Sequence, residues 1–146
     1  MTGLAVRLLI IGAIVGGGIL FRDRLTSGAT DLKVGDCFDD TTATTEVKDV
    51  QHHPCTESHT AEVVLTTNYP APKGAPYPGR SGMSTYSDQT CTTAVISYVG
   101  MAGNLDTLSY GMFFPKEADW NTGDRWIICY VSTATGSPVS QSLKVH

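Results

Sequence analysis

The sequence predicts an α+β protein with one N-terminal transmembrane helix and a disulfide-stapled domain, in which one main helix packs on an antiparallel sheet. Three observations predict this class. An apolar run opens the chain, all four cysteines lie beyond it, and one helical periodicity stands among several short β-branched segments. The chain is therefore expected to divide into an anchor at residues 1–21, a polar linker at 22–31 and an extracytoplasmic domain at 32–146.

The first element is the anchor. Residues 8–21 carry no polar or charged side chain, and Arg7 is the one charge within residues 3–21. As a helix, residues 3–21 would span about 28 Å, close to a bilayer core of roughly 30 Å. The alternative is a cleaved signal peptide, since small residues allow cleavage after Ala29. The charged residues 22–24 directly after the run favour a retained anchor.

The cysteines set the expected orientation, because structural disulfides form on the oxidising side of a membrane. We expect a single-pass protein of the cell membrane, with a cytoplasmic amino terminus and residues 3–21 in the lipid bilayer. Gly12 and Gly16 form a small-xxx-small pair that permits close packing of a second helix. The expected partners are therefore other membrane-protein subunits.

The domain is acidic. From Asp31 onward it has seven Lys and Arg against thirteen Asp and Glu, a net charge near −6. This balance excludes a basic nucleic-acid surface. Asp36, Asp39 and Asp40 cluster, but calcium would need more oxygen ligands at defined spacing. A solvated acidic turn is expected there, with no cofactor and no small-molecule substrate.

Short segments rich in β-branched and aromatic residues predict the strands. They are Leu32–Phe38, Glu46–Gln51, Ala61–Asn68, Leu108–Phe114, Arg125–Ser132 and a short edge strand at Ser142–Val145. In the fifth of these, alternation places Ile127, Cys129 and Val131 on one face and Trp126, Ile128 and Tyr130 on the other.

The main helix is predicted from Ser84, as its cap, to about Val99. Apolar residues at 91, 94, 95, 98 and 99 share one helical face, and Gly100 is placed to end the helix. Before it, residues 69–84 form a long loop rich in proline and glycine. In that loop Tyr69, Tyr77 and Arg80 are candidate partner contacts, and a solvated connection is the alternative.

The four cysteines allow three pairings. Cys91 lies on the apolar face of the helix and Cys129 on an apolar face of a strand, so these two should meet. That leaves Cys37 to pair with Cys55. The spacing contains no Cys-x-x-Cys pair, which disfavours a zinc ribbon or a thioredoxin-like site.

Histidines crowd around one cysteine. His52, His53 and His59 flank Cys55, a set that could bind zinc or copper or activate a thiol nucleophile. Both readings need a reduced Cys55, and adjacent histidines on a strand point to opposite faces. No Gly-x-Ser-x-Gly, His-Glu-x-x-His or P-loop motif occurs. We therefore expect no enzyme and no catalytic, cofactor-binding or metal residue, and leave the role of the histidines open.

Several motifs seen together are similar to the actinobacterial septum formation domain family. They are Val-Gly-Asp-Cys-Phe-Asp at 34–39, Pro-Cys-Thr-Glu-Ser-His-Thr-Ala-Glu-Val at 54–63, Tyr-Val-Gly at 98–100, and the stretch from Pro115 through Trp120 to Cys129. The resemblance covers about residues 33–143. It implies a membrane-anchored extracytoplasmic domain with paired cysteines and no established catalytic residues.

The resemblance also implies roles for the motif residues as scaffold. His59 and Glu62 are expected to hold the loop after Cys55, and Arg125 is expected to pair with a nearby carboxylate. A small single-pass chain of this kind resembles accessory subunits of large actinobacterial membrane assemblies, including the mycobacterial respiratory supercomplex.

The implied function is a non-catalytic accessory or assembly subunit, with its domain on the outer face of a larger membrane complex. The alternative is a cell-envelope or division-associated factor that recognises wall material or a partner protein. Trp120 and Trp126 would then be its sugar-stacking surfaces.

Overall fold

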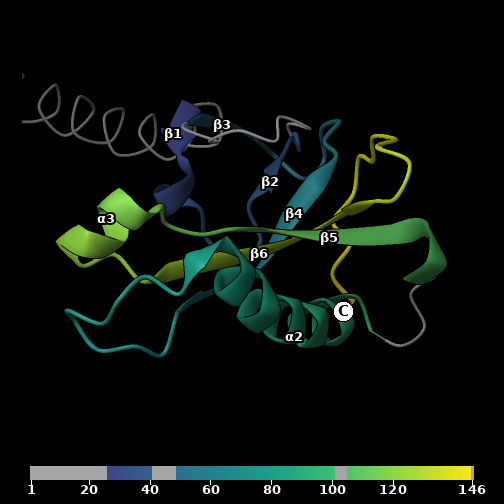
Figure 1. Ribbon diagram of the computed structural model, residues 1–146. Coiled ribbons are helices and arrows are strands. Elements are labelled where there is room, and N and C mark those ends of the chain that lie inside the picture. The colour runs from purple at the N-terminus through teal and green to yellow at the C-terminus, as the bar shows by residue number, and fades with distance from the viewer. Residues whose placement is uncertain (1–25, 41–48, 101–104, 146) are drawn as a thin grey trace, which may run out of the picture.

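The computed structural model describes residues 26–40, 49–100 and 105–145 of the 146-residue chain. In these ranges one main helix packs on a curled antiparallel sheet, in agreement with the expected α+β class (Figure 1). No helix of the described ranges is long and apolar enough to cross a membrane. The anchor expected at 1–21, with Gly12 and Gly16, lies outside the described residues.

Five strands form the sheet in the order β3-β2-β4-β6-β5, and β1 adds to it beside β3. All neighbouring strands are antiparallel. The strands are β1 Thr26–Gly28, β2 Cys37–Phe38, β3 Asp49–His53, β4 Ala61–Asn68, β5 Leu108–Phe113 and β6 Trp126–Thr133. The helices are α2 Gly79–Val99 and α3 Glu117–Thr122, with short 3₁₀ turns at Ala29–Asp31 and Leu105–Thr107.

Each face of the sheet has its own apolar cluster. On the face covered by α2, Ile127, Cys129 and Val131 of β6 pack with buried residues of the helix. On the opposite face, Ile128 and Tyr130 pack in the second cluster. Both faces of β6 are therefore buried, with the alternation that its sequence predicts.

The main helix begins six residues earlier than expected, with Pro78 at the cap position in place of Ser84. Pro78 precedes its first residue, and the fixed φ of proline suits a helix start. Ser84 is therefore inside α2 and does not cap it. The helix ends at Val99 as predicted, and Gly100 follows with a positive φ of 70°, which glycine adopts without strain because it has no Cβ.

The N-terminal part of the domain differs from the prediction in two ways. The strand expected over Leu32–Phe38 shortens to Cys37–Phe38, because a turn closes when Asp36 N–H donates to the Lys33 carbonyl at 3.0 Å. The polar linker expected at 22–31 does not extend to its predicted end. Thr26–Gly28 pairs with β3, and Ala29 is buried.

Three smaller differences concern short elements. The second strand, expected over Glu46–Gln51, is described over Asp49–His53, and the expected residues 46–48 lie outside the described residues. Helix α3 was not expected, since six residues are too few for a helical periodicity to be recognised. No strand forms at 142–145; the nearest pairing is an isolated bridge between His59 and Val139.

Candidate functional site

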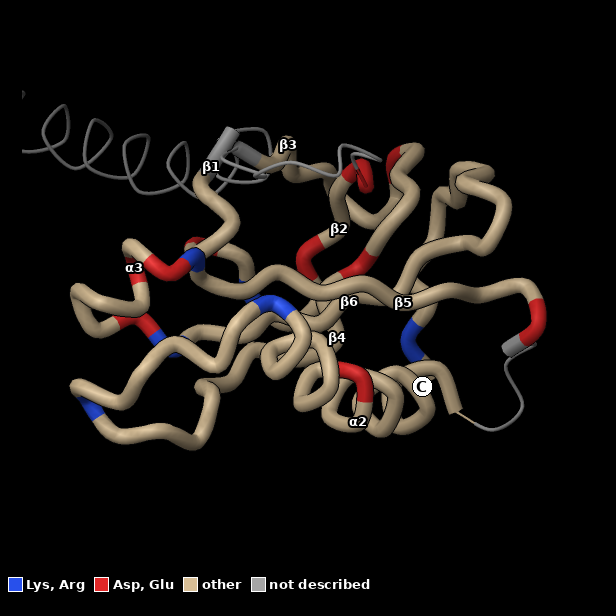
Figure 2. Tube along the Cα trace, viewed as in Figure 1, with Lys and Arg blue, Asp and Glu red and all other residues tan. Residues whose placement is uncertain are grey.

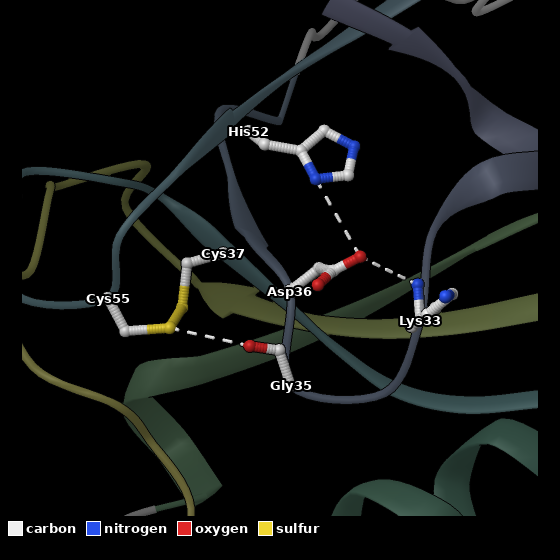
Figure 3. Close-up of polar contacts among 6 residues, drawn as sticks. All are labelled: Lys33, Gly35, Asp36, Cys37, His52 and Cys55. Atoms are coloured by element: carbon white, nitrogen blue, oxygen red, sulfur yellow. Dashed lines mark hydrogen bonds and ion pairs between the residues drawn. A yellow bond between two sulfur atoms is a disulfide. The ribbon is translucent and has the colours of Figure 1, made fainter. Parts of the chain in front are cut away.

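The densest group of ligand-type side chains surrounds the disulfide between Cys37 and Cys55 (Figure 3). Strands β2 and β3 build this site, because Cys37 pairs with His53 and Phe38 with His52 across the ladder. Together they shape a cavity of about 130 Å³. It is lined by Gly35, Asp36, Cys37, His52, His53, Pro54 and Cys55.

Each of the two adjacent histidines has its own aspartate. The Nδ1 of His52 lies 3.7 Å from the Asp36 carboxylate, which also accepts the backbone N–H of Lys33 at 2.8 Å. The Nε2 of His53 lies 2.9 Å from the Asp39 carboxylate. The acidic turn therefore contributes the carboxylates of Asp36 and Asp39 to the site, and the Asp39 side chain is 53% exposed, as expected for a solvated turn.

Both cysteine pairs match the expected pairing. Cys37 bonds to Cys55 and Cys91 to Cys129, with Cα–Cα distances of 5.3 and 5.2 Å, inside the usual range for disulfides. The Sγ of Cys55 also contacts the Gly35 carbonyl oxygen at 3.4 Å. No cysteine is free, so the site as it stands offers no thiol nucleophile.

The site also lacks the ligand geometry of a metal centre. Among the described residues, one group places three potential ligand atoms within 4.8 Å of one another: Cys37, Cys55 and Glu62. Its two sulfurs are bonded to each other and are not available as thiolates. The zinc or copper set considered for His52, His53, Cys55 and His59 is thus not brought together.

His59 has the role expected of it. Its ring is fully buried, and Nδ1 donates to the Glu57 carbonyl at 2.8 Å, which holds the loop after Cys55. The backbone of His59 also exchanges two hydrogen bonds with Val139, at 2.9 and 2.8 Å. These contacts attach the loop to the C-terminal segment.

Glu62 has a different role from the one expected. It is 1% exposed, and its carboxylate accepts the Tyr98 hydroxyl at 2.6 Å, the Ser142 hydroxyl at 2.7 Å and the Leu143 N–H at 2.7 Å. It therefore connects β4 to α2 and to the C-terminal segment, and not to the loop after Cys55. Charge-assisted bonds of this kind are stronger than neutral ones.

Two buried tyrosines lie against carboxylates. Burial, reinforced by the hydrogen bond to Glu62, raises the pKa of Tyr98 well above 10.0. Burial together with Asp40, which accepts the Tyr130 hydroxyl at 3.2 Å, raises the pKa of Tyr130 in the same direction. Both phenols therefore keep their protons in the folded chain at pH values where an unfolded chain loses them.

This difference predicts alkaline destabilisation. Above pH 10 the unfolded state binds fewer protons than the folded state, so the free energy of unfolding falls as pH rises. Below pH 10 the two tyrosines contribute no pH dependence. Urea unfolding at several pH values from 8 to 12 measures the slope. Tyr98→Phe and Tyr130→Phe should each reduce the slope above pH 10, and an unchanged slope would contradict the assignment.

Trp120 organises the proline-rich loop before α2. The indole is 1% exposed, and its Nε1–H donates to the Ala75 carbonyl at 2.7 Å. Tyr69 and Tyr77 contact its ring edge-on, with centroids 5.4 and 5.7 Å away. Since Trp120 is inside the domain, it cannot serve as the sugar-stacking surface considered for it.

Arg125 completes this arrangement, and the carboxylate partner expected for it is not found among the described residues. Its guanidinium lies 3.6 Å above the Trp120 ring, a cation–π contact. It donates to the backbone carbonyls of Trp120 at 2.9 Å, Asp124 at 2.6 Å and Pro72 at 3.2 Å. The planar, multiply donating guanidinium thus fastens the proline-rich loop to the end of α3.

The three candidate partner contacts in this loop differ in accessibility. Tyr69 and Tyr77 are partly buried and direct their rings at Trp120. Arg80 is exposed at the start of α2. Of the three, Arg80 is the one with its side chain open to a partner, and its role as a contact stays a prediction.

One surface had no counterpart in the sequence reasoning. Among the described residues, strand β5 lies at an edge of the sheet, and the Tyr110 hydroxyl on it donates to the Asp88 carboxylate of α2 at 3.2 Å. The sequence feature that could have drawn attention to this strand is the absence of any charged residue between Asp106 and Lys116. The position of the strand at an edge was not readable from the chain.

The fold and site define a disulfide-stapled α+β domain whose best candidate site is a structural bridge flanked by histidine–aspartate pairs. The comparisons agree with the family resemblance: the model of the septum formation family matches residues 34–146. The chain belongs to the septum formation family. No curated protein and no solved structure matches it.

Proposed function

We propose that this protein is a non-catalytic accessory subunit that holds its domain on the outer face of a larger membrane-protein assembly. The observation that carries the proposal is the state of the candidate site. Cys37 and Cys55 form a disulfide, His59 and Glu62 are committed to bonds that hold the fold, and His53 pairs with Asp39. The groups that could have done chemistry are used as scaffold.

The proposed location follows from the two disulfides and the opening apolar run. Disulfides persist in oxidising compartments, and a span of residues 3–21 would attach the domain to the membrane from that side. The partner is named by class only, as membrane-protein subunits. Nothing in the comparisons supports the respiratory supercomplex as the assembly in question.

The test is to purify the full chain from its native membranes in a gentle detergent and measure the mass of the particle that contains it. We expect a particle well above the 15.6 kDa of the chain, with other membrane proteins in fixed ratio to it. A monodisperse lone protomer would contradict the proposal. Retention of the chain on isolated cell wall at low salt would instead favour the wall-recognising alternative.

The anchor offers a matched pair of variants for the same measurement. In the expected helix, Gly12→Leu with Gly16→Leu fills the surface proposed to receive a neighbouring helix. Gly18→Leu adds the same side chain about 200° around the helix from Gly16. Loss of the particle with the first variant and not with the second would support docking through that surface.

A further inference from the structure

We propose that β5 is a docking edge, where an extended segment of a partner protein adds to the sheet as a further strand. This inference rests on the proposed function, since it names the place where the domain meets its partner. Strand β5, Leu108–Phe113, pairs with β6 on one side. On its other side no strand of the described residues lies against it.

An open edge of this kind is unusual in a soluble domain. Unpaired backbone groups at an edge can capture another chain, and native proteins usually block them with charges, proline or very short strands. The opposite edge of this sheet follows the rule, because β1 has three residues. Strand β5 has six residues and contains neither a charged residue nor a proline (Figure 2).

The hydrogen-bond register shows which backbone groups are available. The Ala134 N–H donates to the Thr107 carbonyl at 2.8 Å, so this opposed pair is a hydrogen-bonded one. Bonded and non-bonded pairs alternate along an antiparallel ladder. The backbone groups of Ser109, Gly111 and Phe113 therefore face β6.

It follows that Leu108, Tyr110 and Met112 present their N–H and C=O groups to the free edge. Three donors and three acceptors at alternate residues match the edge of another extended polypeptide. This pattern of backbone bonds is how strand addition provides affinity in peptide recognition.

The charges near the edge indicate what the added strand carries. Tyr110 is 39% exposed and donates to Asp88, which is itself exposed. Asp106, also exposed, lies two residues before the strand. No Lys or Arg occurs between residues 100 and 115. A partner segment with a Lys or Arg opposite Tyr110 would complement this half of the edge.

The same charges disfavour a second copy of this chain as the occupant. Pairing of two β5 strands about their midpoints would place two Tyr110–Asp88 pairs next to each other. Like charges brought together across an interface weaken it. The partner segment is therefore assigned to a different protein.

The test uses the full chain labelled with ¹⁵N and a synthetic hexapeptide, acetyl-Thr-Val-Lys-Val-Thr-Val-amide, as a probe. We expect the amides of Leu108, Tyr110 and Met112 to shift and to exchange more slowly with solvent, while Ser109 and Gly111, already bonded to β6, change less. A peptide N-methylated at two adjacent central residues blocks both of its own edges and should not bind. A Glu in place of the Lys should weaken binding.

Two variants of Tyr110 distinguish the contribution of the backbone to peptide binding from that of the side chain. Tyr110→Pro removes the outward N–H and leaves the ladder to β6 intact, as edge strands tolerate. It should weaken peptide binding roughly tenfold through the loss of one hydrogen bond to the peptide. Tyr110→Ala removes the same ring but keeps the N–H, and its binding should stay close to that of the wild type.

The outcomes also distinguish this inference from the proposed function. If Tyr110→Pro binds the peptide as tightly as Tyr110→Ala, or if the N-methylated peptide binds as well as its parent, the docking edge is wrong while the accessory role stands. If the wild-type chain purifies alone, the accessory role is wrong. The shifts and solvent exchange of the β5 amides in the presence of the peptide then still show whether β5 is a docking edge. A homodimer that protects the same amides would show that the occupant is a second copy and overturn the assignment.

Discussion

Replacing both Cys91 and Cys129 with Ala is expected to lower the free energy of unfolding by about 2–5 kcal/mol. This bridge joins α2 to β6 across the main core, and both of its cysteines are fully buried. Its loss releases a cross-link over 38 residues and removes sulfur contacts from the centre of the domain. Urea or guanidinium unfolding of the oxidised protein measures the change.

The second bridge provides the matched control. Cys37 and Cys55 are 18 residues apart and join β2 to the segment after β3, so replacing them with Ala should act more locally. Hydrogen exchange should show loss of protection in β2 and β3, with α2 and β6 still protected. If removal of this pair loosened α2 as much as removal of Cys91 and Cys129, the two-cluster description of the core would be wrong.

The second large effect is expected at Glu62. Glu62→Ala leaves the buried Tyr98 hydroxyl and the part-buried Ser142 hydroxyl and Leu143 N–H without their common acceptor. A buried donor left unsatisfied costs about 1–3 kcal/mol and a part-buried one less, so the free energy of unfolding should fall by roughly 2–4 kcal/mol. The C-terminal segment should also lose protection from hydrogen exchange.

Two control variants sharpen this test. Glu117→Ala removes an exposed glutamate at the start of α3 and should change the free energy of unfolding by less than about 0.5 kcal/mol. Glu62→Gln keeps the size of the side chain and one acceptor oxygen, but it brings an N–H₂ group against the three donors. Its free energy of unfolding should therefore lie between those of Glu62→Ala and Glu117→Ala. Equal free energies of unfolding for Glu62→Ala and Glu117→Ala would contradict the role of Glu62 as the acceptor that joins β4 to α2 and the C-terminal segment.

Much of the domain could be predicted because its signals are local or apolar. Strand β4, the two faces of β6 and the end of α2 follow from alternation, helical periodicity and a glycine. The disulfide pairing follows from which apolar faces must meet when a helix packs on a sheet. Predictions based on these patterns are correct when each helix or strand buries the apolar face that its sequence indicates.

The predictions for polar residues were less successful. Glu62 was assigned to the loop next to it in the chain, and Arg125 to a carboxylate. Their partners are set by the packing: Glu62 reaches residues 36 and 80 positions away, and Arg125 lies on the Trp120 ring. A polar group takes whichever partner the buried core leaves within reach, and sequence distance does not limit that choice.

The sequence by itself determined the α+β class, the acidic and disulfide-stapled character of the domain, and its membership of the septum formation family. Only the tertiary structure decided that Trp120 is buried, that the candidate site is a structural bridge, and that β5 is an edge strand of the sheet formed by the described residues. The physical reason is that composition and periodicity describe one segment of the chain at a time. Burial and strand neighbours depend on how segments far apart in the chain come together.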